Sequence, residues 1–183
     1  MNLIDIMPAP QRAGTEAEVI ARVAADLRKH SGQTEPAFST QAIVETCFPT
    51  VFVTGGQLPD GVDELVSVRA EGPVIVYSRR LAVPSQRFAI AHAIAHLLFD
   101  DASAAARPGR LGIPHVERRA DSFAAELLAP LEELRPYVAR GPSDDPEEQE
   151  IYLDMVDMIS SHFVLPSDVI DRQIRTLLGV SAA

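Results

Sequence analysis

Apolar residues near the start of the chain recur every three or four positions, the spacing of a helix with one buried face. The periodic residues are Val19, Ile20, Val23, Ala24 and Leu27. Thr15 and Glu18 have the spacing of a capping box, in which each side chain bonds the other's backbone N–H. We therefore predict a helix over 16–31 and a shorter one over 41–47, which ends before Pro49.

The period then changes to that of short strands. Residues 50–54, 65–69 and 74–77 are rich in β-branched side chains, and glycines and prolines separate them as turns. These features predict a small, mostly antiparallel three-stranded sheet. Its last strand leads directly into the next helix, which Ser85 is placed to cap.

Helical spacing returns in the second half of the chain. We predict a loop over 100–112, a helix over 116–128, and a solvated linker over 140–150, which is rich in acidic residues and proline. A helical pair over 151–163 and 167–178 closes the chain.

The predicted fold class is therefore α+β, with the small sheet packed against the helix that follows it and several further helices. The length of 183 residues suits a single domain, 1–183. Within it, residues 15–139 form the sheet and most helices, and 151–178 form the C-terminal helical pair.

Charge and composition narrow the class of protein. The chain carries 26 acidic against 16 basic residues, a net charge of −10. Such a surface repels phosphate backbones, so we expect no direct binding of nucleic acid; it serves solubility or attracts a basic partner. The chain has no apolar run of roughly 18 residues and no signal-like start. With Cys47 as the only cysteine, these features lead us to expect a cytoplasmic protein without a membrane partner.

Two histidines suggest a metal site. His92 and His96 are four residues apart within a predicted helix, so they share a face and can converge on one ion. Taken alone, the pair is equally explained by two packed or half-exposed histidines on an ordinary helix, as in a structural helical protein.

A carboxylate for the same ion begins the next predicted helix. Glu117 can supply a third zinc ligand, and Asp121, one turn later, can accept the remaining ring N–H of a ligating histidine. Glu117 by itself is also an ordinary acidic residue in the first turn of a helix. Its combination with the histidines favours the ligand.

Three segments resemble the ImmA/IrrE family of metallopeptidases. Residues 86–98, QRFAIAHAIAHLL, look like that family's RxRFTxAHELGHLLL helix, and residues 117–130 resemble its ExxANxFAxxLLMP segment. Residues 159–178 are similar to its LAxxFxVSxxAVxxRL tail, and 74–78 fit the strand before the metal helix.

The resemblance implies a gluzincin-like zinc site with His92, His96 and Glu117 as ligands, although manganese is an alternative metal. It further implies an endopeptidase that cleaves a helix-turn-helix repressor of the XRE type and so derepresses stress, mobile-element or phage-defence genes. An extended substrate would then add to the strand Val74-Ile75-Val76-Tyr77. The oligomeric state stays open.

One position departs from the family pattern. The residue after the first histidine should be the glutamate that takes a proton from water, and here it is Ala93, which accepts no proton. We favour an engineered Glu→Ala change, which makes this chain an inactivated form. The alternative is a natural pseudopeptidase, a binding module that sequesters a regulator.

Other polar residues are weaker candidates. An oxyanion donor could come from His115, His162, Tyr77 or Tyr137, each of which is better explained by packing or surface exposure. Cys47 is expected to be a small core residue rather than a latent ligand. Arg87 is expected to pair with an unspecified carboxylate near the start of its helix.

Overall fold

A computed structural model describes residues 14–100, 107–108 and 114–180. The helices before the sheet are α2 (Glu16–Ser31) and α3 (Thr40–Cys47). The sheet strands are β1 (Phe52–Gly56), β2 (Glu64–Arg69), β3 (Gly72–Ser78) and the short β4 (Arg107–Pro108). The remaining elements are α4 (Val83–Phe99), α5 (Pro114–Leu128), α6 (Leu131–Leu134), the 3₁₀ turn η1 (Arg135–Tyr137), α7 (Pro146–Phe163) and α8 (Ser167–Leu178). The predicted α+β class is confirmed.

The sheet has the order β1-β3-β2-β4, with β3 between β1 and β2. β2 pairs antiparallel with β3, as expected, and also with the short β4, which adds a fourth strand to the three predicted. β1 pairs parallel with β3, with Phe52 opposite Val74. Gly72, the first residue of β3 after the tight β2–β3 turn, has φ +129°, and a Cβ there would meet the Thr50 carbonyl oxygen at 2.5 Å. A side chain at this position would therefore be strained.

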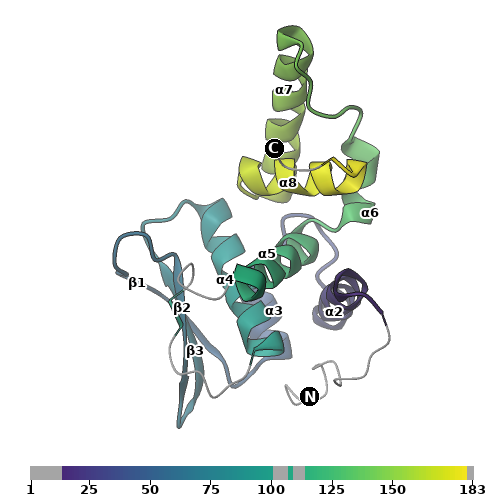
Figure 1. The fold of residues 1–183 in the computed structure, drawn as a ribbon. Helices are drawn as coiled ribbons and strands as arrows, with labels where there is room; N and C mark the ends of the chain where they lie inside the picture. The colour runs from purple at the N-terminus through teal and green to yellow at the C-terminus, as the bar shows by residue number, and fades with distance from the viewer. Residues whose placement is uncertain (1–13, 101–106, 109–113, 181–183) are drawn as a thin grey trace.

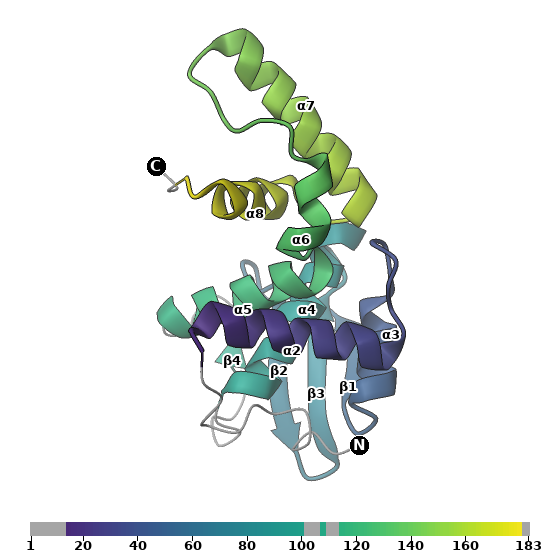
Figure 2. The ribbon, with the colours of Figure 1, turned by 90° about the vertical axis from the view of Figure 1, so that its right-hand side faces the viewer.

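Helix α4 follows β3 after a short turn and packs on β2 and β3 (Figure 1). Helices α5 and α2 form the next layer: α5 lies against α4, and α2 lies against α5 (Figure 2). Buried alanines, among them Ala91, Ala95, Ala120 and Ala124, keep the side chains of α4 and α5 small. Small contact residues let two helices approach closely, which brings the first turn of α5 to the histidines of α4.

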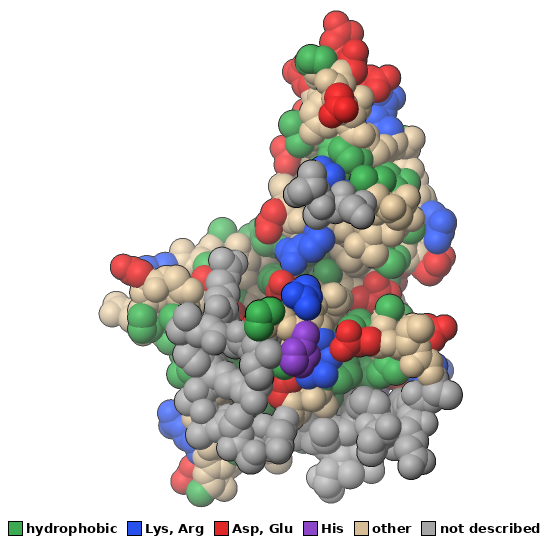
Figure 3. Space-filling view, in the orientation of Figure 1, with side chains coloured by type: hydrophobic (Ala, Val, Ile, Leu, Met, Phe, Trp, Pro, Cys, Tyr) green, Lys and Arg blue, Asp and Glu red, His purple; other side chains and the backbone are tan. Residues whose placement is uncertain are grey.

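The C-terminal elements from α6 to α8, which we call the arm, lie on top of this core (Figure 1). Helix α7 projects from the body, and α8 turns back beneath it to reach α5 and α6. Acidic side chains cover the far end of α7 (Figure 3). Within the described ranges, no helix combines the length and apolarity that crossing a membrane requires.

Two predicted boundaries were wrong. Helix α4 begins at Val83, and its N-cap is Ala82 rather than Ser85, because Pro84 occupies the first turn and needs no N–H partner there. Helix α7 begins at Pro146 within the predicted linker, where the Asp145 side chain caps the N–H groups of Glu147 and Glu148. Apart from Asp100 and the two residues of β4, the predicted loop 100–112 lies outside the described residues.

Candidate metal centre

Side chains from two helices converge on one point in the protein. The Nε2 atoms of His92 and His96 are 2.9 Å apart. Glu117 Oε2 lies 3.2 Å from the first and 3.6 Å from the second. Both histidines are buried, while the Glu117 side chain is 18% exposed. The three residues that the sequence singled out therefore share one site.

The outer ring nitrogens are fixed by carboxylates. His92 Nδ1 lies 3.0 Å from Asp121 Oδ1, and His96 Nδ1 lies 2.6 Å from Asp100 Oδ2. A carboxylate accepts hydrogen bonds, so each Nδ1 carries the donated hydrogen and each Nε2 directs its lone pair at the shared point. Arg172 and Arg119 hold the two carboxylates in turn, at 3.1 Å and 2.6 Å.

Two Nε2 lone pairs at this distance repel each other unless a proton or a metal ion lies between them. Burial lowers the pKa of His92, but the Asp121 hydrogen bond and the charges of Glu64, Asp121 and Glu117 outweigh that effect and raise it. The hydrogen bond to His92 likewise holds the pKa of Asp121 below its ordinary value despite burial. The site is therefore built to hold positive charge.

The donor set fits a zinc ion. Tetrahedral zinc with bonds of about 2.0–2.1 Å would place its donors roughly 3.3 Å apart. The three separations here, 2.9, 3.2 and 3.6 Å, bracket that value. Two imidazoles and one carboxylate are also a ligand set of catalytic zinc sites, in which a fourth position takes water or substrate.

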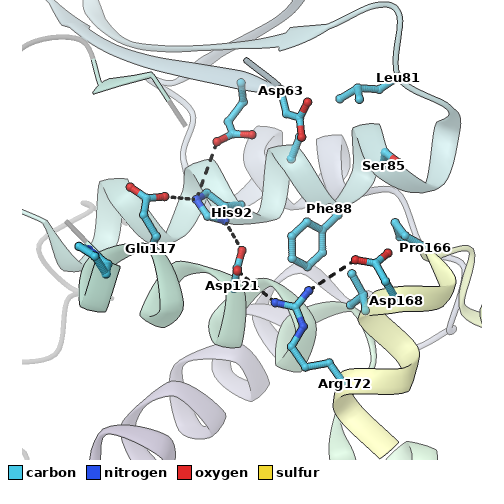
Figure 4. A pocket seen from close by; sticks show the side chains of 14 residues that line it. Asp63, Leu81, Ser85, Phe88, His92, Glu117, Asp121, Pro166, Asp168 and Arg172 are labelled. Atoms are coloured by element: carbon cyan, nitrogen blue, oxygen red, sulfur yellow. Dashed lines mark hydrogen bonds and ion pairs between the residues drawn. The ribbon is translucent and has the colours of Figure 1, made fainter. Parts of the chain in front are cut away.

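A cleft of about 550 Å³ opens beside His92 and Glu117 (Figure 4). Among the described residues that line the cleft, the acidic ones are Asp63, Glu64, Glu117, Asp121 and Asp168. Arg172 also lines the cleft, and its guanidinium group forms ion pairs with Asp121 and Asp168. The described lining of the cleft is therefore predominantly negative.

Glu64 reaches the same site from the sheet. It is the first residue of β2, and its Oε1 lies 3.8 Å from His92 Nε2 with the side chain 6% exposed. It does not belong to the group formed by His92, His96 and Glu117, whose donor atoms all lie within 4.8 Å of one another. Glu64 therefore stands beside the potential ligands rather than among them.

Ala93 is fully buried in the core, and its neighbour one turn earlier, Ala89, lines the cleft. Helical side chains lean toward the helix N-terminus. A longer side chain at 93 would therefore extend over Ala89 toward the cleft.

The prediction that an extended peptide adds to the strand over 74–77 was wrong. Val74, Ile75, Val76 and Tyr77 lie in β3, which is hydrogen-bonded to β1 on one side and to β2 on the other. Adding a strand requires an edge with unpaired N–H and C=O groups, and this segment has neither edge available. Periodicity could not reveal this, because it does not give the order of strands in a sheet.

The weaker candidates lie elsewhere. None of His115, His162, Tyr77 and Tyr137 is among the described residues that line the cleft. Tyr137 Oη and His162 Nε2 are instead 3.0 Å apart on the exposed side of the arm. Cys47 is buried in the core, as expected.

Arg87 does not pair with the expected carboxylate. Its guanidinium donates to four backbone carbonyl oxygens, those of Phe163, Val164, Pro36 and Phe38.

Sequence reasoning missed two site residues. Asp100 follows His96 by four residues, a spacing that places both on one helix face, so that signal was available. Glu64 had no such signal, because its approach to His92 depends on how α4 packs on β2.

The model of the Peptidase_M78 family, described as the IrrE N-terminal-like domain, matches residues 51–173. This range contains the sheet, both site helices and most of the arm. The match supports a metallopeptidase-type role. No curated protein matches the chain.

Proposed function

Because the chain belongs to the Peptidase_M78 family of IrrE N-terminal-like domains, we propose that His92, His96 and Glu117 hold a catalytic zinc ion. The observation that carries this proposal is the convergence of their donor atoms within 2.9–3.6 Å. A bound zinc ion would polarise a peptide carbonyl and activate water. Asp121 and Asp100 would keep both imidazoles oriented toward it.

The proposed reaction is endoproteolysis of a helix-turn-helix repressor of the XRE type, which would derepress stress, mobile-element or phage-defence genes. The acidic cleft and the net charge of −10 support a basic partner, and DNA-binding proteins carry basic surfaces. The same charges disfavour nucleic acid as the ligand. We place the protein in the cytoplasm, where its repressor would be.

Ala93 bears on whether this chain cleaves its partner or only binds it. If a glutamate at 93 is the sole source of the proton-accepting carboxylate, the chain is either an inactivated form or a pseudopeptidase that sequesters its regulator. Loss of a general base costs on the order of 10²–10⁴-fold in rate.

Metal binding is tested first, by titrating zinc into the metal-free protein and counting bound ions by mass spectrometry. We expect one zinc per chain, abolished in His96→Ala. The matched control is His30→Ala, which removes an exposed histidine of α2 and should bind normally. Manganese titrated in parallel tests the alternative metal. Equal zinc binding by His96→Ala and the unchanged chain would refute the site.

Cleavage is tested with the helix-turn-helix repressor whose gene lies nearest to the gene of this protein. The Ala93→Glu protein with zinc should cut it at a defined bond, and a chelator should stop the reaction. Stable binding without cleavage by Ala93→Glu would instead favour the binding module.

A further inference from the structure

We propose that Glu64 supplies the proton-accepting carboxylate that position 93 lacks, so that this chain hydrolyses peptides with Ala93 in place. The inference rests on the proposed metal centre and adds a catalytic residue to it. It moves the carboxylate from the metal-binding helix α4 to the first residue of strand β2.

The distance suits a group that acts through one water molecule. Glu64 Oε1 is 3.8 Å from His92 Nε2, and Glu64 lies outside the compact group of three donors. A water that is shared between the site and a carboxylate sits about 2.5–2.7 Å from the accepting oxygen. Glu64 is therefore placed to hold such a water beside the ligands without joining them.

The shape of the cleft explains how Glu64 of β2 can take the role of a glutamate at position 93 of α4. Glu64 and Ala89 both line it, and a glutamate at 93 would extend over Ala89 into the same space. A carboxylate arriving from β2 therefore occupies the region that the family pattern serves from α4. Because α4 packs directly on β2, the two routes differ in origin but meet at His92.

The burial of Glu64 also points to a role in the site. Its side chain is only 6% exposed, and a buried carboxylate is costly without charged or hydrogen-bonded partners. A metal ion held by His92, whose Nε2 lies 3.8 Å from Glu64 Oε1, would supply such a charge. Strand pairing with Tyr77 fixes the backbone of Glu64 beside the site.

The proposed reaction is ordinary hydrolysis. The oxygen of a water molecule bonds to the peptide carbon while one water proton passes to Glu64. The C–N bond then breaks, the proton moves from Glu64 to the leaving nitrogen, and the carboxylate is restored. The products are a new carboxyl terminus and a new amine, and no other reactant is consumed.

The test uses the full chain with zinc and a pool of random-sequence decapeptides in H₂¹⁸O. We expect ¹⁸O in new internal carboxyl termini, detected by mass spectrometry. Glu64→Gln should lower the rate by about 100-fold or more, since it keeps the shape but accepts no proton. Zinc affinity should stay unchanged in this variant. The matched control is Glu71→Gln, at the exposed far end of the same β2–β3 hairpin, which should cleave normally.

A double variant separates chemistry from folding. Adding Ala93→Glu to Glu64→Gln should restore hydrolysis, because one carboxylate again faces the cleft. A double variant no faster than Glu64→Gln would overturn the exchange of positions on which the proposal rests.

Three other results would also overturn the proposal: a zinc-bound chain that incorporates no ¹⁸O, equal rates for Glu64→Gln and the unchanged chain, or a loss of zinc affinity of about 10-fold or more in Glu64→Gln, which would make it a ligand. Zinc binding without hydrolysis would thus reject only the proposed role of Glu64 and leave the metal centre in place. Absence of zinc binding would reject the metal centre itself.

Discussion

Replacing Arg87 by methionine should destabilise the whole fold, because this residue of α4 joins three separate parts of the chain. Its NH1 group donates to the carbonyl oxygens of Phe163 and Val164, at the end of α7. Its NH2 group donates to those of Pro36 and Phe38, between α2 and α3, at 3.3 and 3.0 Å. Methionine keeps much of the side-chain length but removes every donor.

The size of the effect follows from these contacts. A hydrogen bond from a charged group is worth about 1.5–3 kcal/mol, and the four share one side chain, so their contributions do not add fully. Water can reach some of the released carbonyls, because Arg87 is only half-buried. We expect a loss of about 3–4 kcal/mol. At 2–4 °C per kcal/mol for a chain of this size, Tm should fall by about 6–16 °C.

The assay is thermal unfolding followed by circular dichroism, with Arg80→Met as the matched control. Arg80 bonds Asp60 at 2.7 Å, but the two side chains are 58% and 94% exposed. An exposed ion pair contributes at most about 1 kcal/mol. Arg87→Lys should fall between the two, because a single ammonium group cannot span both sets of carbonyls. A Tm loss in Arg87→Met no larger than in Arg80→Met would refute the reasoning.

Three further predictions concern the site and the arm. Asp121→Ala should weaken zinc binding by about 10–100-fold, measured by competition with a chromophoric chelator, because His92 loses the acceptor that orients it; unchanged affinity would show that Asp121 does not support the metal. Since the pKa of His92 is raised, protons should begin to compete with zinc, and the apparent zinc affinity should begin to fall, once the pH drops below a value above about 6.5, the ordinary imidazole value. In the metal-free protein the sign is opposite: the stability contributed by protonated His92 is complete below about 6.5 and is lost as pH rises through the raised pKa. A zinc affinity that is independent of pH down to the ordinary imidazole value, or metal-free stability that increases across this window, would contradict the shift. Tyr152→Phe should cost about 1.5–3 kcal/mol in urea unfolding, because the buried hydroxyl of α7 donates to Asp171 of α8; a loss below about 0.5 kcal/mol would indicate that this bond adds nothing net.

The helices with clear end signals could be predicted from the sequence. The capping box at Thr15 and the left-handed Gly32 bound α2 as expected, and both strands of the β2–β3 hairpin were found. The start of α7 was missed although Asp145 followed by Pro146 is an N-cap with proline in the first turn. The acidic, proline-containing composition of that stretch concealed a local signal that was present.

The residues of the site likewise fall into those that could be predicted from the sequence and those that could not. Residues related by helical spacing, such as His92 with His96 and Glu117 with Asp121, could be paired from the sequence. Glu64 and the central position of β3 could not, because both depend on which strand lies beside which helix. Such contacts between distant segments leave no periodic trace in the chain.

The parallel pairing of β1 with β3 has a consequence for synthesis on the ribosome. β1 emerges before β2, yet its hydrogen-bonded neighbour β3 is translated only after β2 is complete. α2 waits longer still, because it packs against α5, which begins at Pro114. A nascent chain that stops before α5 therefore leaves uncovered the part of the apolar face of α2 that α3 does not contact, and we expect the N-terminal half to gain full protease resistance only once α5 has left the exit tunnel.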